Sequence, residues 1–500
     1  MVPLLASVLA LAAPAPATAL VQIDRAHVRA AAPLLRRAGA VEVGPELRVW
    51  RVPAAAVPAL RRSGVVVFSE PERLLHRAVA APTDPLIGEQ WWRGAVGADR
   101  ATPPGPGKPI TIVDSGLDMS HPEFADRPNT TVLNAQTVRS GDDDHGTEVG
   151  SVIAAPENGI GLVGVYPLAD LRSWDASPRG SFSDGAAIEG VLAAGRGGPG
   201  VINLSFGGPL ADPLLEEAIL TAVKEGSIVV AASGNDGSRG NPVSFPAQYP
   251  HVLTIGATDR TDAVARFSTA SAFVDLVAPG VAIPVAEPTF DDASGFTRAS
   301  GTSFSSPMVA GAAAWVWTVR PELDNTQLFE VMRRSARDID APGVDSRSGY
   351  GILDIPAALA LPAPPPDPLE PNDDAEQIEP GRLFAGGAAP LTTARQGAAT
   401  VAASVDRRED PRDFYRVLVP PHRRVTATTH GAVDLRIFRR TARPLRAKPA
   451  AISAHRGDVP DRVTYLNRGP RAAYVYVEVT PEGNVRDARY TLTVATSARR

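Results

Sequence analysis

Between about residues 84 and 361, short apolar runs alternate with segments of helical periodicity. Four of the runs are apolar and rich in β-branched residues: ITIVD (110–114), VINLSF (201–206), SIVVAAS (227–233) and VLTIGA (252–257). Such runs are typical of strands that are buried on both faces. Helical patterns follow them, as in PLLEEAILTAVKEG over residues 213–226. This alternation predicts an α/β domain with a mostly parallel sheet over residues 84–361.

The segment before this domain, residues 20–80, has a different order of elements. Its pattern predicts a strand near 20–23, a helix over 26–37, a strand pair across 41–52, a helix over 54–62 and a strand over 65–68. This βαββαβ order is enough for a small α+β domain of the ferredoxin-like type.

The segment after the α/β domain begins with a proline-rich stretch, residues 362–371, which is typical of a stiff polyproline linker. Beyond it, residues 372–500 show period-2 alternation and no good helix. The best strand candidates are FYRVLV (414–419), DLRIF (434–438), YVYVEV (474–479) and YTLTV (490–494). We therefore predict a small all-β sandwich.

The composition of the 500 residues is globular, with 44% hydrophobic and 21% charged residues and a net charge of −5. This weakly acidic balance gives no electrostatic reason to expect a nucleic-acid partner. The chain has no cysteine, which excludes a cysteine nucleophile, thiolate metal sites and disulfides. No later segment has the ~18 apolar residues that a membrane span needs. We expect a monomer without a membrane span.

The N-terminal stretch MVPLLASVLALAAPAPATA, residues 1–19, favours export. It has an apolar segment over residues 2–13, followed by Ala17-Thr18-Ala19, a small-x-small cleavage signature. It lacks the usual basic residues at its start, and the alternative is a buried N-terminal helix or strand. We predict a signal peptide and a secreted, extracellular protein.

Polar residues follow several of the predicted strands, where ligands gather in a parallel sheet. Asp114 ends the run ITIVD, and Asn235 follows SIVVAAS. His145 and Ser303 each begin a helix of small residues, and a helix N-terminus favours negative charge. Taken singly, each residue also fits a loop cap, a turn, a surface histidine or a helix cap.

A metal site at His145 is a further alternative, because Glu148 lies three residues later on the same helix face. A hydrolytic zinc site usually needs a third ligand and a frame similar to H-E-x-x-H. No second histidine is near in sequence, so we do not expect a metal here.

Together the four motifs VDSGLDMSHPEF, DHGTEVGSVIAA, VINLSFGG with AASGNDG, and GTSFSSPMVAG resemble the subtilisin-like serine protease family (subtilases) over about 280 residues. The order Asp…His…Ser is that of the subtilisin triad. The resemblance implies a three-layer α/β fold and a serine endopeptidase acting on proteins or peptides. It implies that Ser303 is the nucleophile, His145 the general base and Asp114 its orienting partner. Asn235 and the Ser303 backbone N–H would form the oxyanion hole.

The resemblance also implies a substrate cleft. One edge would be formed by Ser205, Phe206 and Gly207, and the opposing edge by Gly180, Ser181 and Phe182; the pocket walls and floor would be Ala232, Gly234 and Ser244. Small residues there predict a roomy, mainly apolar pocket. Glu148, Met308 and Phe304 depart from the commonest family pattern, but none of them is catalytic.

A structural calcium ion is the one cofactor that the resemblance implies. The loop AAPENGIGLVGVYP, residues 154–167, resembles without a gap the family's calcium-binding loop. The implied ligands are the side chains of Asn158 and Glu123, the carbonyls of Pro156, Ile160 and Leu162, and Gln90. Calcium accepts such a set, since it takes 6–8 oxygen ligands. The alternative is a glycine-rich turn without a metal.

The flanking segments are similar to known companions of this family. Residues 20–80 resemble the inhibitory propeptide, which the enzyme itself would remove, and residues 372–500 resemble a bacterial prepeptidase C-terminal domain through EPNDD, DPRDFYRV, DLRIF and YTLTV. One alternative function is a catalytically dead subtilase that acts as a binding module. Another is a different serine hydrolase such as a lipase, but no G-x-S-x-G elbow surrounds Ser303.

Overall fold

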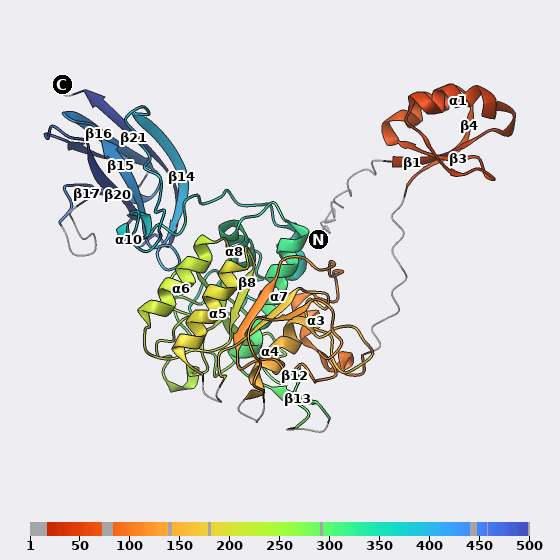
Figure 1. Ribbon diagram of the computed structural model, residues 1–500, viewed down its shortest axis with the longest axis horizontal. Helices are drawn as coiled ribbons and strands as arrows, with labels where there is room; N and C mark the ends of the chain where they lie inside the picture. The colour runs from red at the N-terminus through yellow and green to blue at the C-terminus, as the bar shows by residue number, and fades with distance from the viewer. Residues whose placement is uncertain are drawn as a thin grey trace, which may run out of the picture. The chain divides into compact units, whose positions relative to one another are not determined.

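The computed structural model describes residues 18–72, 84–138, 143–178, 182–290, 294–440, 448–457 and 459–498. The chain forms two compact units, residues 1–81 and 82–500 (Figure 1). No helix among the described residues is long and apolar enough to cross a membrane.

The N-terminal unit is a four-stranded antiparallel sheet of order β2-β3-β1-β4 with two helices. Its elements are β1 (Thr18–Ile23), η1 (Arg25–His27), α1 (Val28–Arg37), β2 (Val41–Gly44), β3 (Val49–Pro53), η2 (Ala54–Ala56), α2 (Val57–Arg62) and β4 (Val66–Pro71). Val21, Ile23 and Val52 are fully buried, and Leu35 of α1 packs against this strand core. The βαββαβ order predicted from the sequence is present.

The larger unit is built on a seven-stranded parallel sheet of order β11-β10-β9-β8-β5-β7-β6. The strands are β5 (Ile110–Asp114), β6 (Thr130–Val132), β7 (Leu171–Asp175), β8 (Val201–Leu204), β9 (Ile228–Ala232), β10 (Val252–Thr258) and β11 (Leu276–Pro279). The four apolar runs of the sequence are β5, β8, β9 and β10. All four strands are buried at every position, as the lack of alternation predicts.

Helices cover both faces of this sheet and make it the middle of three layers (Figure 1). The elements around it are η3 (Ile87–Glu89), α3 (Trp92–Val96), α4 (His145–Ala154), α5 (Asp184–Arg196), α6 (Pro213–Lys224), η5 (Gly237–Arg239), the hairpin β12 (Ile283–Ala286) and β13 (Phe296–Ala299), α7 (Thr302–Val319), α8 (Asn325–Arg334) and α9 (Ile355–Ala360). Alternate strand residues pack against α4 and α7 on one face and against α5 and α6 on the other. The predicted α/β architecture is confirmed.

The C-terminal part is a sandwich of two four-stranded antiparallel sheets, β14-β21-β16-β19 and β15-β20-β17-β18. Its elements are α10 (Ala375–Ile378), β14 (Ala398–Asp406), β15 (Asp413–Val419), β16 (Arg423–His430), β17 (Val433–Arg439), β18 (Ala451–Ser453), β19 (Asp461–Leu466), β20 (Ala473–Pro481) and β21 (Asp487–Ala498). Inward-facing residues of both sheets form one core. The predicted sandwich is present, with one short helix, α10, that the strand pattern did not predict.

The proline-rich segment, residues 362–371, lies against its neighbours. The Gln327 side chain donates to the carbonyl of Pro364 (2.6 Å), and the Lys224 ammonium donates to the carbonyl of Leu369 (3.2 Å). The Asp367 carboxylate accepts from the backbone N–H of Ser404 in β14 (2.9 Å). The segment is therefore docked on both the α/β domain and the sandwich, which its composition alone did not indicate.

Candidate active site

Asp114 and His145 meet at the carboxyl end of the sheet. Asp114 is the last residue of β5 and is buried, and His145 is the first residue of α4. The ring N–H at His145 Nδ1 donates to Asp114 Oδ1 at 2.8 Å, and the backbone N–H of Ser115 donates to the same oxygen at 2.7 Å. This bond fixes the ring orientation and leaves Nε2 as the free ring nitrogen.

The pKa of His145 reflects two opposing effects. Burial lowers it, but the charge and hydrogen bond of Asp114, with Glu148 and Asp144 nearby, outweigh burial and raise it to about 9. The side chain remains 32% exposed, so it can exchange protons with a substrate or with water. This site therefore stabilises an imidazolium, the form that a general base adopts once it has taken a proton.

Ser303 lies in the first turn of α7, beside Asn235. Its hydroxyl donates to the carbonyl of Ser205 at 3.2 Å, and the ring of the next residue, Phe304, lies 6.0 Å from the ring of His145. To donate to His145 instead, the Ser303 hydroxyl must leave the Ser205 carbonyl. The helix start supplies backbone N–H groups that have no partner within the helix.

The Asn235 side chain is held in one orientation. Its Oδ1 accepts from the backbone N–H of Thr302 (2.9 Å) and from the Thr302 hydroxyl (3.0 Å). Its Nδ2 group has no acceptor among the described residues. A Cβ at Gly301 would lie 3.3 Å from Nδ2, a tight contact that glycine avoids. The result is an anchored amide donor next to Ser303.

A cavity of about 530 Å³ adjoins these residues. Among its lining residues are Ser205, Phe206, Gly207, Ala232, Gly234, Asn235, Ser244, Thr302 and Ser303. The predicted residues of the first edge, the walls and the floor therefore lie together, whereas Gly180 and Ser181 of the opposing edge lie outside the described residues. A Cβ at Gly207 would approach the Ser244 hydroxyl to 2.8 Å, so glycine keeps this wall open.

One feature of the cleft was not predicted from the sequence. Asp236 also lines the cavity, but it pairs with Arg239 at 2.8 Å, so its charge is already compensated. Phe182, expected at the opposing edge, contacts Phe206 with tilted rings whose centroids are 4.5 Å apart. The three departing residues Glu148, Phe304 and Met308 are buried, and burial raises the pKa of Glu148 to about 7.

The candidate calcium loop closes over Glu123, which is fully buried. Glu123 Oε1 accepts from the backbone N–H of Leu162 (2.8 Å), and Asn158 Nδ2 donates to Glu123 Oε2 (3.3 Å). Burial raises the pKa of Glu123 to about 8. A Cβ at Gly161 would lie 2.6 Å from Glu123 Oε1, so glycine lets the loop backbone close over the carboxylate.

Asp84 and Gln90 change the ligand set expected for this loop. Both expected amide ligands already accept a hydrogen bond: Gln90 exchanges two bonds with the backbone of Val163 (2.9 and 3.0 Å), and Asn158 Oδ1 accepts from the backbone N–H of Ile160 (2.8 Å). Asp84 is 2% exposed; its Oδ1 accepts from the N–H of Asn158, and its Oδ2 has no partner among the described residues. The donors are oxygens only, which fits calcium. Sequence reasoning missed Asp84.

Comparisons with known proteins identify the family. The profile of the subtilase family matches residues 105–351. Subtilisin BL and Subtilisin Savinase, both from Lederbergia lenta, are each 35% identical over 257 residues, which is 51% of this chain and 91% of each relative. Subtilisin E from Bacillus subtilis is 34% identical over 255 residues, or 50% of this chain and 65% of the relative.

Among solved structures, the psychrophilic subtilisin-like protease Apa1 from Pseudoalteromonas sp. AS-11 matches with a TM-score of 0.48 and 21% identity, over 54% of this chain and 97% of that chain. The assignment depends on the sequence relatives, which are covered over most of their length. The chain belongs to the subtilase family of serine endopeptidases.

Proposed function

We propose that residues 84–361 hydrolyse peptide bonds through Ser303, His145 and Asp114, with Asn235 in the oxyanion hole. This proposal depends above all on the 2.8 Å bond between Asp114 and His145. Ser303 lies in the first turn of α7, where the next residue, Phe304, has its ring 6.0 Å from the His145 ring. A peptide in the adjoining cavity would present its carbonyl to Ser303. No feature of the described residues favours the dead binding module or the lipase.

In the proposed mechanism, Ser303 Oγ attacks the scissile carbonyl while His145 Nε2 takes its proton. Asp114 keeps the ring in the tautomer that leaves Nε2 free and stabilises the imidazolium. The oxyanion receives hydrogen bonds from Asn235 Nδ2 and the Ser303 backbone N–H. His145 then gives its proton to the leaving amine. In the second half of the reaction His145 takes a proton from water, the water oxygen attacks the acyl carbonyl, and His145 returns the proton to Ser303 Oγ.

We also propose that the protein is a secreted proenzyme, with residues 1–19 as signal peptide, 20–80 as inhibitory propeptide and 372–500 as an appended C-terminal domain. The separate fold of the N-terminal unit supports a removable segment. Most of the signal segment, residues 1–17, lies outside the described residues. Strand β1 begins at Thr18, so a cut after Ala19 would remove its first two residues.

We further propose that the loop around Asn158 holds a calcium ion. Glu123, Asn158 and the carbonyls of Pro156, Ile160 and Leu162 are the proposed ligands, and Asp84 replaces Gln90 among them. The ion would neutralise two buried carboxylates and hold the loop against the segment that contains Asp84.

The full chain with Ser303→Ala tests the catalytic assignment. We expect peptidase activity to fall by about 10⁶-fold, the loss known for the nucleophile of subtilisin, and the chain to keep its N-terminal unit. Ser300→Ala is the matched control, because Ser300 is an exposed serine just before α7. Normal trimming of Ser303→Ala would show that another protease removes the N-terminal unit. Normal turnover, or a parent chain that a serine-directed phosphonate does not label, would refute the function itself.

A further inference from the structure

Six oxygen-bearing side chains gather where the proline-rich segment meets the start of the sandwich. We call them the linker cluster: Asp367, Glu370, Asn372, Asp373, Asp410 and Asp413. Ligand atoms of Asp367, Glu370 and Asp413 lie within 4.8 Å of one another. The backbone N–H of Phe414 donates to the carbonyl of Asn372 (2.8 Å), which brings the two segments together.

Every member of the linker cluster has a buried oxygen that accepts no hydrogen bond from the described residues. These atoms are Asp367 Oδ1, Glu370 Oε1, Asn372 Oδ1, Asp373 Oδ1, Asp410 Oδ1 and Asp413 Oδ1. Asn372 and Asp413 are fully buried. A buried acceptor without a partner is costly and rare in folded proteins. Six of them in two short segments, five from carboxylates, indicate a cation as the partner; the Nδ2 donor at the other end of the Asn372 amide also has no partner among the described residues.

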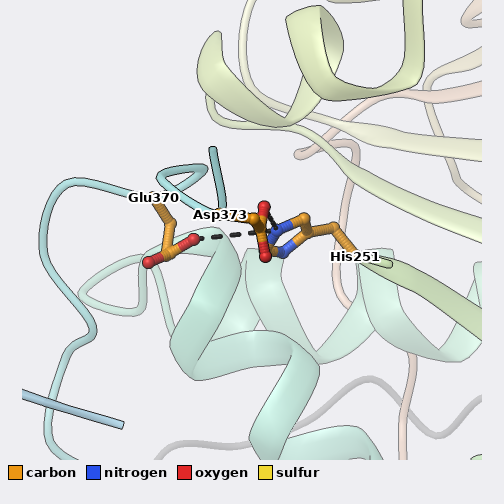
Figure 2. A group of neighbouring side chains, drawn as sticks. All are labelled: His251, Glu370 and Asp373. Atoms are coloured by element: carbon orange, nitrogen blue, oxygen red, sulfur yellow. Dashed lines mark hydrogen bonds and ion pairs between the residues drawn. The ribbon is translucent and has the colours of Figure 1, made fainter. Parts of the chain in front are cut away.

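The neighbouring donors contact other atoms of the cluster. His251 Nε2, just before β10, contacts Asp373 Oδ2 (2.8 Å) and Glu370 Oε2 (3.7 Å), as Figure 2 shows. The Lys224 ammonium donates to the backbone carbonyls of Leu369 and Glu370. These contacts leave the six oxygens without partners among the residues that the structure describes.

Tyrosines occupy the far side of Asp413. The hydroxyls of Tyr415 (3.2 Å) and Tyr490 both donate to Asp413 Oδ2. The carboxylates of Asp367, Glu370 and Asp413 have ligand atoms within 4.8 Å of one another. Packing them together without a counter-ion is unfavourable, because like charges repel and buried carboxylates lose their hydration.

We propose that the linker cluster binds one calcium ion, which fastens the proline-rich segment to the start of the sandwich. Six side-chain oxygens match the 6–8 oxygen ligands that calcium takes. Zinc is disfavoured because it prefers four ligands rich in nitrogen or sulfur, and the one nearby imidazole contacts Asp373. Through Asp373 and His251, the ion also stabilises the contact between the sandwich and the α/β domain. This site is separate from the loop around Glu123.

Calcium binding to the full chain tests this proposal, in a Ser303→Ala background that prevents self-digestion. After removal of bound metal with EDTA, titration calorimetry with CaCl₂ gives the number of ions per chain. We expect Asp413→Asn and Glu370→Gln each to bind one ion fewer than the parent. Asp461→Asn is the matched control: Asp461 is a buried sandwich acid that pairs with Ser453 and His455 away from the cluster. We expect it to bind as many ions as the parent.

Melting temperatures separate an ion site from a merely structural carboxyl. In EDTA, Asp413→Asn should melt at or above the parent, because it removes one of several repelling charges. Adding calcium should raise the melting temperature of the parent more than that of Asp413→Asn. Equal ion counts in the parent and both cluster variants would overturn the proposal, and so would binding of zinc in preference to calcium.

Hydrogen exchange tests the proposal in a chain whose linker cluster is unchanged, so the result does not depend on whether a cluster variant folds. In the Ser303→Ala chain, calcium should slow exchange in peptides that cover residues 367–374 and 410–415. The loop around Asn158 reports separately on the other site. Calcium-independent exchange in both linker-cluster segments would also overturn the proposal.

Discussion

The candidate active site and the linker cluster differ in the polar atoms that they hold ready for a ligand. At the active site this atom is a donor, Asn235 Nδ2, which Thr302 holds in place through the other end of the amide; the buried Asp114 Oδ2 also has no partner among the described residues. In the linker cluster six buried acceptors, such as Asp413 Oδ1, have no partner among the described residues, against a single donor, Asn372 Nδ2. A fixed donor is suited to negative charge that develops briefly in a transition state. Fixed acceptors in number are suited to a positive ion that stays bound.

The two regions also differ in how their permanent charges are compensated. Asp114 pairs directly with His145, so the active site is balanced within the fold. The linker cluster has five carboxylates, and only two of them contact an imidazole, that of His251. The comparison suggests that the first site is complete for chemistry when the chain is folded, whereas the second is complete only with an ion.

The largest expected effect comes from removing the amide donor, Asn235 Nδ2. We expect Asn235→Ala to lower kcat by roughly 10²–10³-fold with little change in KM, because the donor strengthens only as the oxyanion forms; the magnitude is that of the equivalent residue in subtilisin. Asn235→Asp is the matched variant, since it keeps an acceptor for Thr302 but has no donor. Steady-state kinetics on a peptide substrate measure both. A change confined to KM, or full activity in Asn235→Asp, would place Asn235 in substrate binding instead.

The residues of the active site were predictable because each lies in a contiguous motif at the end of a strand or the start of a helix. The strand run that ends at Asp114 and the helix that begins at Ser303 are both local patterns. The βαββαβ unit and the sandwich followed from local periodicity in the same way. Long-range contacts had no such signal.

The linker cluster illustrates what local patterns cannot give. EPNDD and DPRDF are visible in the sequence, but only the fold brings Glu370 close both to Asp413 and to His251. Asp84 was missed for the same reason, because a single acid before a proline has no periodicity. Its partner Asn158 is 74 residues away. Gln90 is a ligand that the resemblance implies, and the structure places its amide on the backbone of Val163, a contact that local sequence does not indicate.

Titrating His145 tests whether its charge is balanced by Asp114. With a pKa of about 9, the neutral base becomes available only as the pH rises, so kcat/KM should increase about tenfold per pH unit up to roughly pH 9. The raised pKa also means that the charged His145 stabilises the folded state. This contribution to the free energy of unfolding is fully present below pH 6.5, the ordinary pKa of histidine, and is lost as the pH rises through about 9. A pH profile of kcat/KM measures the first effect. A pH midpoint near 6.5 in this profile would mean that Asp114 does not stabilise the positive charge of His145.

Asp114→Asn sharpens this test, because it keeps a polar side chain of the same size and removes the charge. We expect its acid limb to move to lower pH while its plateau falls, since the amide can hold the wrong tautomer of His145. A limb that stays at the parent position would assign the raised pKa to Glu148 and Asp144 instead.

The smallest expected effect concerns the loop around Asn158, where donors and acceptors are mixed. Glu123 already has two hydrogen bonds there, so a calcium ion would add to a partly satisfied site, unlike the linker cluster. A folded-state ligand stabilises by RT ln(1 + [L]/Kd), about 2.7 kcal/mol at 100 times Kd. The melting temperature should therefore be higher in calcium than in EDTA, and Asn158→Ala and Asp84→Asn should each reduce that difference.

Gln90→Ala should lower the melting temperature equally in both conditions, because it breaks two bonds to Val163 and removes no ligand. Since a ligand carboxylate must be ionised and the pKa of Glu123 is raised to about 8, the calcium-dependent gain should grow as the pH rises toward 8. A calcium gain that Gln90→Ala abolishes and Asp84→Asn leaves intact would restore Gln90 as the ligand and remove Asp84.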